Sequence, residues 1–381
     1  MRRLRVVAAG AAVAIALSGC GSSTKTGASG GSGTSARKIA FTLTKAGCDP
    51  AHLELPAGAT TFDVKNDGAD AVSEMELQQG GRIVGEVENL TPGLSGSFTV
   101  TLEPGTYQTA CPNGTSAAKG DLVVTGVAGS GTTVASASAA LAATAVTNYR
   151  AYVESEVAQL VITTTSFVDA VKAGDVASAK ALFPKARIHY ESVEPIAETF
   201  SSLDENIDAR ANDVPASTFR GFHRIEQQLW VAGNTAGMAH DADELLSDVK
   251  RLQAFLPTVK LEPAQIANGA VELLNEVASS KITGEEDRFS HTDLWDFEGN
   301  LEGAKAAFTA VRPLLGKSPT LATTIDRQFT STRDALDQYQ TPGGGFVLYT
   351  ALTRTQTRGL AAQVEALADS LAQVPPLVVA G

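Results

Sequence analysis

The stretch Phe219-Arg-Gly-Phe-His-Arg-Ile-Glu-Gln-Gln-Leu-Trp230 predicts a helix that carries two polar residues on or near its apolar side. At about 100° per residue, one arc of this helix holds its apolar side chains, namely Phe219, Phe222, Ile225, Leu229 and Trp230. Glu226 projects inside that arc, and His223 lies at its edge. A buried carboxylate is costly unless it gains a proton, a basic partner or a metal ion. The pattern therefore indicates either a polar pair that bonds neighbouring helices or a metal site, because residues i and i+3 can share one ion.

Within this stretch, Gly221-Phe-His-Arg-Ile-Glu226 has the form Gly-x-His-x-x-Glu. With its flanks it resembles the signature of the imelysin-like family, which carries a peptidase name, and in particular the EfeO branch of that family. The resemblance runs from about Arg37 to the C-terminus. It implies a multidomain, β plus all-α protein, in which a small cupredoxin-like β-sandwich precedes an imelysin-like helical domain.

The composition limits the classes of partner. The chain has 381 residues and a formal net charge of −12 at pH 7, which argues against nucleic acid as a ligand and suits cations. After the N-terminus there is no apolar run of about 18 residues, so no internal membrane span is expected.

The N-terminal residues have the pattern of an export signal. Residues 1–19 combine a charged start with an apolar run, which predicts a signal peptide. Leu17-Ser-Gly-Cys20 resembles a bacterial lipobox, which implies cleavage before Cys20 and attachment of lipid to its sulfur. Residues 20–36 are rich in Gly, Ser and Thr and predict a flexible tether. We therefore expect an extracytoplasmic lipoprotein anchored to the bacterial membrane, in the cell envelope or periplasm.

Residues 37–126 predict a small sandwich, because short alternating strands are separated by Gly and Pro turns. Cys48 and Cys111 lie here, and an exported protein can hold them as a disulfide or as metal ligands. Glu74 and Glu76 are two residues apart and share one face of a strand. The family resemblance places all four side chains together as a candidate copper or iron site, with zinc as a further option. Since His52 is the only histidine of this region, an ordinary blue-copper centre is not expected.

Residues 127–144 predict a linker, and residues 145–376 an all-α region of two up-and-down four-helix bundles. The pattern predicts helices over 146–172, 176–200, 215–232, 240–256, 263–281, 293–315, 319–340 and 345–373.

Two further stretches of the helical region resemble family segments. In Arg187 to Glu198, Glu191, Glu194 and Glu198 share one helical face. Such a stripe is ordinarily solvated, but the resemblance favours at least one carboxylate that faces the site. In Gly284 to Glu298, the candidates are Asp287, His291, Asp293 and Asp296. The alternative is that these aspartates serve the N-terminus of a helix and the histidine a loop hydrogen bond.

The candidate ligands are mostly carboxylates with one or two imidazoles, which suits iron. The resemblance implies a component that captures iron and passes it to a membrane permease, with a haem peroxidase-like protein as a third component. A metallopeptidase is one alternative, although neither His-Glu-x-x-His nor His-x-x-Glu-His is present, since Gln227 follows Glu226. A lipoprotein that binds an envelope polysaccharide is another. The sequence therefore favours a binding protein over an enzyme.

Overall fold

The computed structural model describes residues 36–126, 136–200 and 202–380. The predicted signal peptide, Cys20 and nearly all of the tether lie outside the described residues, as do residues 127–135 of the predicted linker. By their contacts, the described residues fall in a single compact unit that includes both the sandwich and the helices. Among the described helices, none is both long and apolar enough to cross a membrane.

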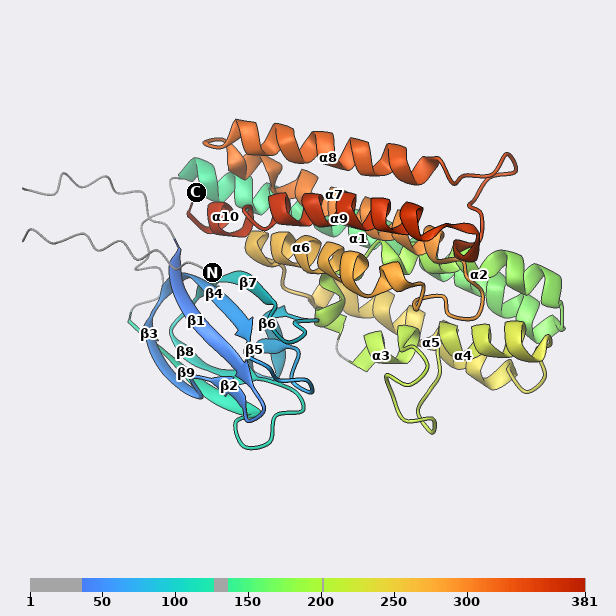
Figure 1. Ribbon diagram of the computed structural model, residues 1–381, viewed down its shortest axis with the longest axis horizontal. Helices are drawn as coiled ribbons and strands as arrows, with labels where there is room; N and C mark the ends of the chain where they lie inside the picture. Colours follow the sequence, from blue (N-terminus) through green and yellow to red (C-terminus); the bar gives the residue numbers. More distant parts are fainter. Residues whose placement is uncertain (1–35, 127–135, 201, 381) are drawn as a thin grey trace, which may run out of the picture. The chain divides into compact units, whose positions relative to one another are not determined.

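Nine strands form the predicted sandwich, coloured from blue to teal in Figure 1. One sheet has the order β2-β1-β4-β7 and the other has the order β3-β9-β8-β5-β6. The β1–β4 and β3–β9 pairs are parallel, and the other pairs are antiparallel. The bounds are β1 Arg37–Thr44, β2 Gly47–Asp49, β3 His52–Pro56, β4 Gly58–Asn66, β5 Met75–Gln79, β6 Arg82–Val87, β7 Ser95–Leu102, β8 Gly105–Ala110 and β9 Lys119–Thr125.

Alternation along the strands builds the sandwich core. Phe41, Phe62 and Phe98 are buried there, with the Phe62 and Phe98 rings stacked at 5.1 Å between centroids. Cys48 and Cys111 lie in the same core and form a disulfide, with Cα atoms 5.7 Å apart. The bridge therefore joins β2 to the end of β8 from inside the sandwich.

From Ser136 onward, the described residues are mainly helical, as predicted. The α-helices are α1 Ser136–Ala173, α2 Val176–Glu191, α3 Ser202–Asp208, α4 Phe222–Gln227, α5 Ala239–Phe255, α6 Pro263–Ser279, α7 Asp293–Val311, α8 Pro319–Asp337, α9 Arg354–Leu371 and α10 Pro375–Ala380. Short 3₁₀ or π turns lie between them, namely η1 Glu194–Phe200, η2 Gln228–Ala232, η3 Leu256–Thr258, η4 Lys281–Thr283, η5 Arg312–Leu315 and η6 Tyr349–Ala351. Helix α1 packs against α2, α5 and α7, whereas α6 packs against α7 and α9.

Two predicted helices are shorter than the pattern suggested. The helix expected over 176–200 ends at Glu191 and gives way to the 3₁₀ turn η1. Pro195 explains this end, because its ring would clash with the carbonyl of Glu191 and it has no N–H to donate. The helix expected over 215–232 begins only at Phe222, after Gly221 at φ 82°. A side chain at Gly221 would also meet the Ile207 carbonyl oxygen at 2.3 Å, so the glycine lets α4 start against α3.

Other boundaries also differ. The helix expected over 345–373 begins at Arg354, where Thr353 and Gln356 form a capping box. Helices α3 and α10 are not predicted by the pattern, because each spans only six or seven residues.

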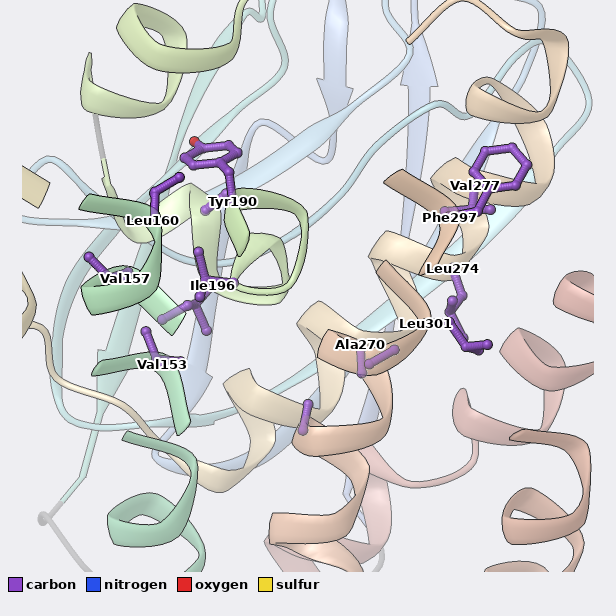
Figure 2. Packing of buried hydrophobic residues seen from close by; sticks show 14 of the residues in the cluster. Val153, Val157, Leu160, Tyr190, Ile196, Ala270, Leu274, Val277, Phe297 and Leu301 are labelled. Carbon is purple, nitrogen blue, oxygen red and sulfur yellow. The ribbon is translucent and has the colours of Figure 1, made fainter. Parts of the chain in front are cut away.

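One continuous apolar core joins the helices. Figure 2 shows Val153, Val157 and Leu160 of α1 together with Tyr190 and Ile196, all of which belong to this core. Ala270, Leu274 and Val277 of α6, and Phe297 and Leu301 of α7, extend the same core. Because α1, α2, α6 and α7 meet in it, the polar residues on their inner faces are brought toward one another.

Helix α6 also contacts the sandwich at the edge strand β7. The Asn268 side chain accepts a hydrogen bond from the Thr99 N–H at 3.1 Å and donates one to the Thr99 carbonyl at 2.7 Å. Next along α6, Glu272 Oε1 accepts a hydrogen bond from the Glu88 N–H at 2.8 Å. The α6 side chains thus satisfy backbone groups of the sandwich that no further strand pairs.

Candidate metal centre

Helix α4 buries the two polar residues of the Gly-x-His-x-x-Glu motif. His223 is 1% exposed and Glu226 is 0% exposed. Phe222 packs beside them against Phe167 and Phe183, which buries this end of the helix. The sequence pattern placed Glu226 inside the apolar arc, and the structure shows the same burial.

Glu226 is fully engaged. Its Oε1 accepts hydrogen bonds from the N–H groups of Phe289 at 2.9 Å and Ser290 at 2.7 Å. Its Oε2 lies 2.9 Å from His223 Nδ1, within hydrogen-bond distance. Burial alone would raise the pKa of Glu226, but the contact with His223 and the Ser290 N–H lower it overall. Glu226 is therefore an ionised carboxylate that holds the imidazole through Nδ1.

The other ring nitrogen of His223 faces a second pair of carboxylates. Nε2 lies 3.5 Å from Glu286 Oε1 and 3.7 Å from Asp208 Oδ1, and it makes no hydrogen bond. His223, Asp208 and Glu286 each offer one ligand atom within 4.8 Å of the others. The set His223, Glu226 and Asp287 meets the same criterion. The histidine thus stands between two candidate ligand sets, one at each ring nitrogen.

Arg187 of α2 lies at the centre of the acidic cluster and is 0% exposed. It pairs with carboxylates from four segments: Glu191, Asp208, Glu286 at 2.9 Å, Asp296 at 3.2 Å and Asp287 at 3.3 Å. A buried guanidinium is tolerable only with such partners, and a rigid fork of donors can hold several at once. Arg187 therefore fixes the positions of most of the carboxylates around His223.

Lys281 of η4 neutralises the next carboxylates along α2 and η1. Its Nζ lies 2.9 Å from Glu191 Oε2 and 2.7 Å from both Glu194 oxygens. Asn300 of α7 donates to the same two side chains, at 2.8 Å and 2.6 Å. Glu191 and Glu194 are thus occupied by protein donors and are not members of either ligand set.

Burial sets the protonation of the cluster. It raises the pKa of Asp208 to about 7, although Arg187 and His223 oppose this, and it raises that of Asp293 to about 8. Burial and Arg187 would lower the pKa of His223, but the hydrogen bond with Glu226 and the nearby carboxylates of Glu286 and Asp208 raise it to about 10. Without a bound cation the site therefore holds extra protons, which an entering metal ion would displace.

The comparisons with known proteins agree with this architecture. The imelysin family model matches residues 145–374, and the cupredoxin-like domain model matches residues 10–124. The "Iron uptake system component EfeO" of Escherichia coli (strain K12) is 41% identical over 342 residues, which cover 88% of this chain and 90% of that protein. This chain belongs to the EfeO family. The proteins of the same name from Shigella flexneri and Escherichia coli O157:H7 match with the same identity and coverage. A crystal structure of reduced auracyanin from Roseiflexus castenholzii aligns with 24% of this chain and all of its own at 21% identity, with a TM-score of 0.22.

The candidate ligands predicted in the stretch Gly284 to Glu298 converge on His223 only in part. Asp287 joins His223 and Glu226 in one candidate set. Asp296 accepts a hydrogen bond from Arg187 through one oxygen. Asp293 accepts one from the Asp287 N–H at 3.3 Å, also through one oxygen. The second oxygen of each carboxylate has no hydrogen-bond partner. His291 is in neither set. It adopts φ 60°, and its backbone bonds Asp287 and Tyr349, so it shapes the loop.

The four-residue site expected in the cupredoxin-like region is not formed as predicted. The disulfide takes both sulfurs, so Cys48 and Cys111 are not free thiolate ligands. Strand alternation separates Glu76 from the disulfide: Met75 and Leu77 of β5 point into the core with the disulfide, whereas Glu76 points to the other face. Glu74 lies just before β5. Only the two glutamates remain as candidate ligands. Burial, and then the charge of Glu76, raise the pKa of Glu74 to about 6.

Sequence reasoning missed Arg187, Asp208 and Glu286. Arg187 and Glu286 lie inside the two stretches 187–198 and 284–298, but neither is among the predicted ligands. Arg187 lies four residues before Glu191, a spacing that predicts an ion pair on a helix. Asp208 ends the short helix α3, and nothing in its local pattern distinguishes it from a surface residue.

Proposed function

We propose that this protein is the iron-binding component of an iron-uptake system, held outside the bacterial membrane by a lipid on Cys20. It captures iron and delivers it to a membrane permease, with a haem peroxidase-like protein as a further component. Membership of the EfeO family supports this role, since the printed name of the relatives is an iron-uptake component. The export signal and lipobox-like Leu17-Ser-Gly-Cys20 support the location.

The observation that carries the proposal is the unpartnered Nε2 of His223. A buried polar atom without a partner is rare, and here it faces Asp208 and Glu286 within 4 Å. We place iron against Nε2 and these two carboxylates. Glu226 then acts from the other side of the ring, since a carboxylate on the far nitrogen fixes the orientation of a metal-binding histidine.

The donor set suits iron as cargo. Carboxylate oxygens favour hard cations such as ferric iron, and a single imidazole shifts the preference toward transition metals. No cysteine occurs after Cys111 in the sequence, so soft thiolate ligation is not available in the helical region. Arg187 fits as the counter-charge that keeps the carboxylates together while the site is empty. In the sandwich, Glu74 and Glu76 are further candidate carboxylate ligands for iron, copper or zinc.

The test is iron binding by the full chain with His223→Gln. His240→Gln is the matched control, because His240 lies on α5 and its side chain is 81% exposed. Equilibrium dialysis against ferric citrate should show about a tenfold or greater loss of affinity for His223→Gln alone. Unchanged binding by a folded His223→Gln protein would overturn the site. For the anchor, Cys20→Ala should abolish lipid labelling and release the protein from membranes.

A further inference from the structure

A cavity of about 470 Å³ lies between the sandwich and the helical region. Sandwich residues Glu76, Glu86 and Glu88 line one side of it. The helical region supplies the other side, including Glu198, Glu272 and Glu276. Among the described residues that line the cavity, twelve are Asp or Glu and one, Arg210, is basic. Low-dielectric walls with charges of one sign concentrate counter-ions, so the composition selects for cations.

The cavity has enough space for a cation that keeps its water. At about 30 Å³ per liquid water, this volume holds on the order of ten or more molecules. The walls offer carboxylates from strands and helices that come from distant parts of the chain. Hard multivalent cations that dehydrate reluctantly bind in such sites through a few carboxylates and several retained waters.

The sandwich and helix α6 meet beside these carboxylates. The Glu88 N–H bonds Glu272 Oε1, which brings the loop after β6 onto α6. Glu276 lies one turn further along α6, and Arg210 reaches it at 3.5 Å. Among the described residues, Arg210 pairs with Glu276, whereas Glu88 and Glu272 form no ion pair with a basic side chain. The protein's own cations therefore leave this part of the cluster under-neutralised.

A second observation points to a ligand. Asp208 and Glu286 line the cavity and are also the two carboxylates that face the unpartnered Nε2 of His223, a side chain that is 1% exposed. The open ring nitrogen thus faces two carboxylates that also line the cavity. Asp208 and Glu286 therefore link the cavity to the histidine.

We propose that this cavity is a second cation site, in which Glu88, Glu272 and Glu276 hold a hydrated multivalent metal ion before it reaches His223. The inference rests on the proposed function, since the inner site is the iron site. It gives the sandwich a part in loading: its glutamates form one wall of the outer site. A hydrated ion in this site exchanges readily, and it loses water only on moving inward to the imidazole.

Terbium(III) is the probe, because it is a hard trivalent ion whose luminescence lifetimes in H₂O and D₂O report the number of bound waters. The full chain is compared with His223→Gln and with Glu88→Gln/Glu272→Gln. In the double variant each amide keeps its volume, and the amide oxygen introduced at position 272 can still accept a hydrogen bond from the N–H of residue 88. Glu154→Gln/Glu365→Gln makes the same charge change at exposed positions of α1 and α9. Circular dichroism and Tm establish that every variant is folded.

The wild type and the exposed control should bind two ions. His223→Gln should keep one ion with several waters, and Glu88→Gln/Glu272→Gln should keep one ion with few waters. In each variant, the affinity of the site that carries the substitution should fall at least tenfold. A folded Glu88→Gln/Glu272→Gln protein that binds two ions like the wild type would show that the outer site is wrong. A wild type that binds one ion, which His223→Gln removes, would show the same. In both cases the proposed function stands. If His223→Gln still binds two ions, the inner site is wrong.

Discussion

Glu226 and His223 meet at 2.9 Å between Oε2 and Nδ1, on consecutive turns of the six-residue helix α4. This contact assigns the two ring nitrogens of His223 to different tasks. Nδ1 is held by an ionised carboxylate, whereas Nε2 stays open toward Asp208 and Glu286. The motif therefore builds an oriented ligand, and residues outside the motif complete the site.

Asp208 belongs to one candidate ligand set and Asp287 to the other. If iron binds at Nε2, Asp208→Asn should weaken ferric binding about tenfold or more, whereas Asp287→Asn should have a smaller effect. Both substitutions remove one buried negative charge beside Arg187, so each controls for the other. Dialysis against ferric citrate measures both affinities. A larger loss for Asp287→Asn would move the ion to the Glu226 side of the ring.

Glu226→Gln tests the positioning role. The amide fills the same volume but loses the charge that fixes the imidazole, so iron affinity should fall about 10- to 100-fold. The pKa of His223, about 10 in the metal-free protein, should also fall, because the Glu226 hydrogen bond raises it. An NMR titration of the His223 ring measures this shift. A lower affinity with an unchanged His223 pKa would indicate a merely structural effect.

Arg187→Met should destabilise the metal-free protein by about 3–5 kcal/mol at pH 8, because its buried carboxylate partners lose their counter-charge. At pH 5 the loss should be smaller, since these carboxylates can take up protons. Urea unfolding at the two pH values measures the difference. Arg358→Met, on the exposed face of α9, should change stability by less than about 0.5 kcal/mol at either pH.

The chelator-treated protein should become less stable as pH rises from about 5 to 8. Burial raises the pKa values of Glu198 and Glu272 from 4.5 to about 8 and that of Asp204 from 3.8 to about 6. The folded state thus binds more protons than the unfolded chain in this window. The stabilisation is complete below the unfolded pKa and is lost as pH rises through the folded values. Thermal unfolding measures the fall in Tm, and a Tm that rises over this window would contradict the raised pKa values.

The sequence by itself determined the class of fold and the motif at the centre of the site. Alternating strands predicted the sandwich, and helical periodicity predicted the bundle, because both patterns are local. Periodicity also placed Glu226 on a buried face, which the structure has at 0% exposure. Helical periodicity alone misplaced the end of α2, because it does not take account of Pro195, which ends the helix at Glu191.

Only the tertiary structure decided the partners of each charge. Arg187 joins carboxylates up to 109 residues away, and no spacing rule connects Arg187 to Asp296. It also decided that Glu191 and Glu194 face Lys281, and that Asp208 and Glu286 face the open nitrogen of His223. The physical reason is that a side chain's burial follows from its own helix, whereas the group that compensates its charge comes from whichever segment packs against it.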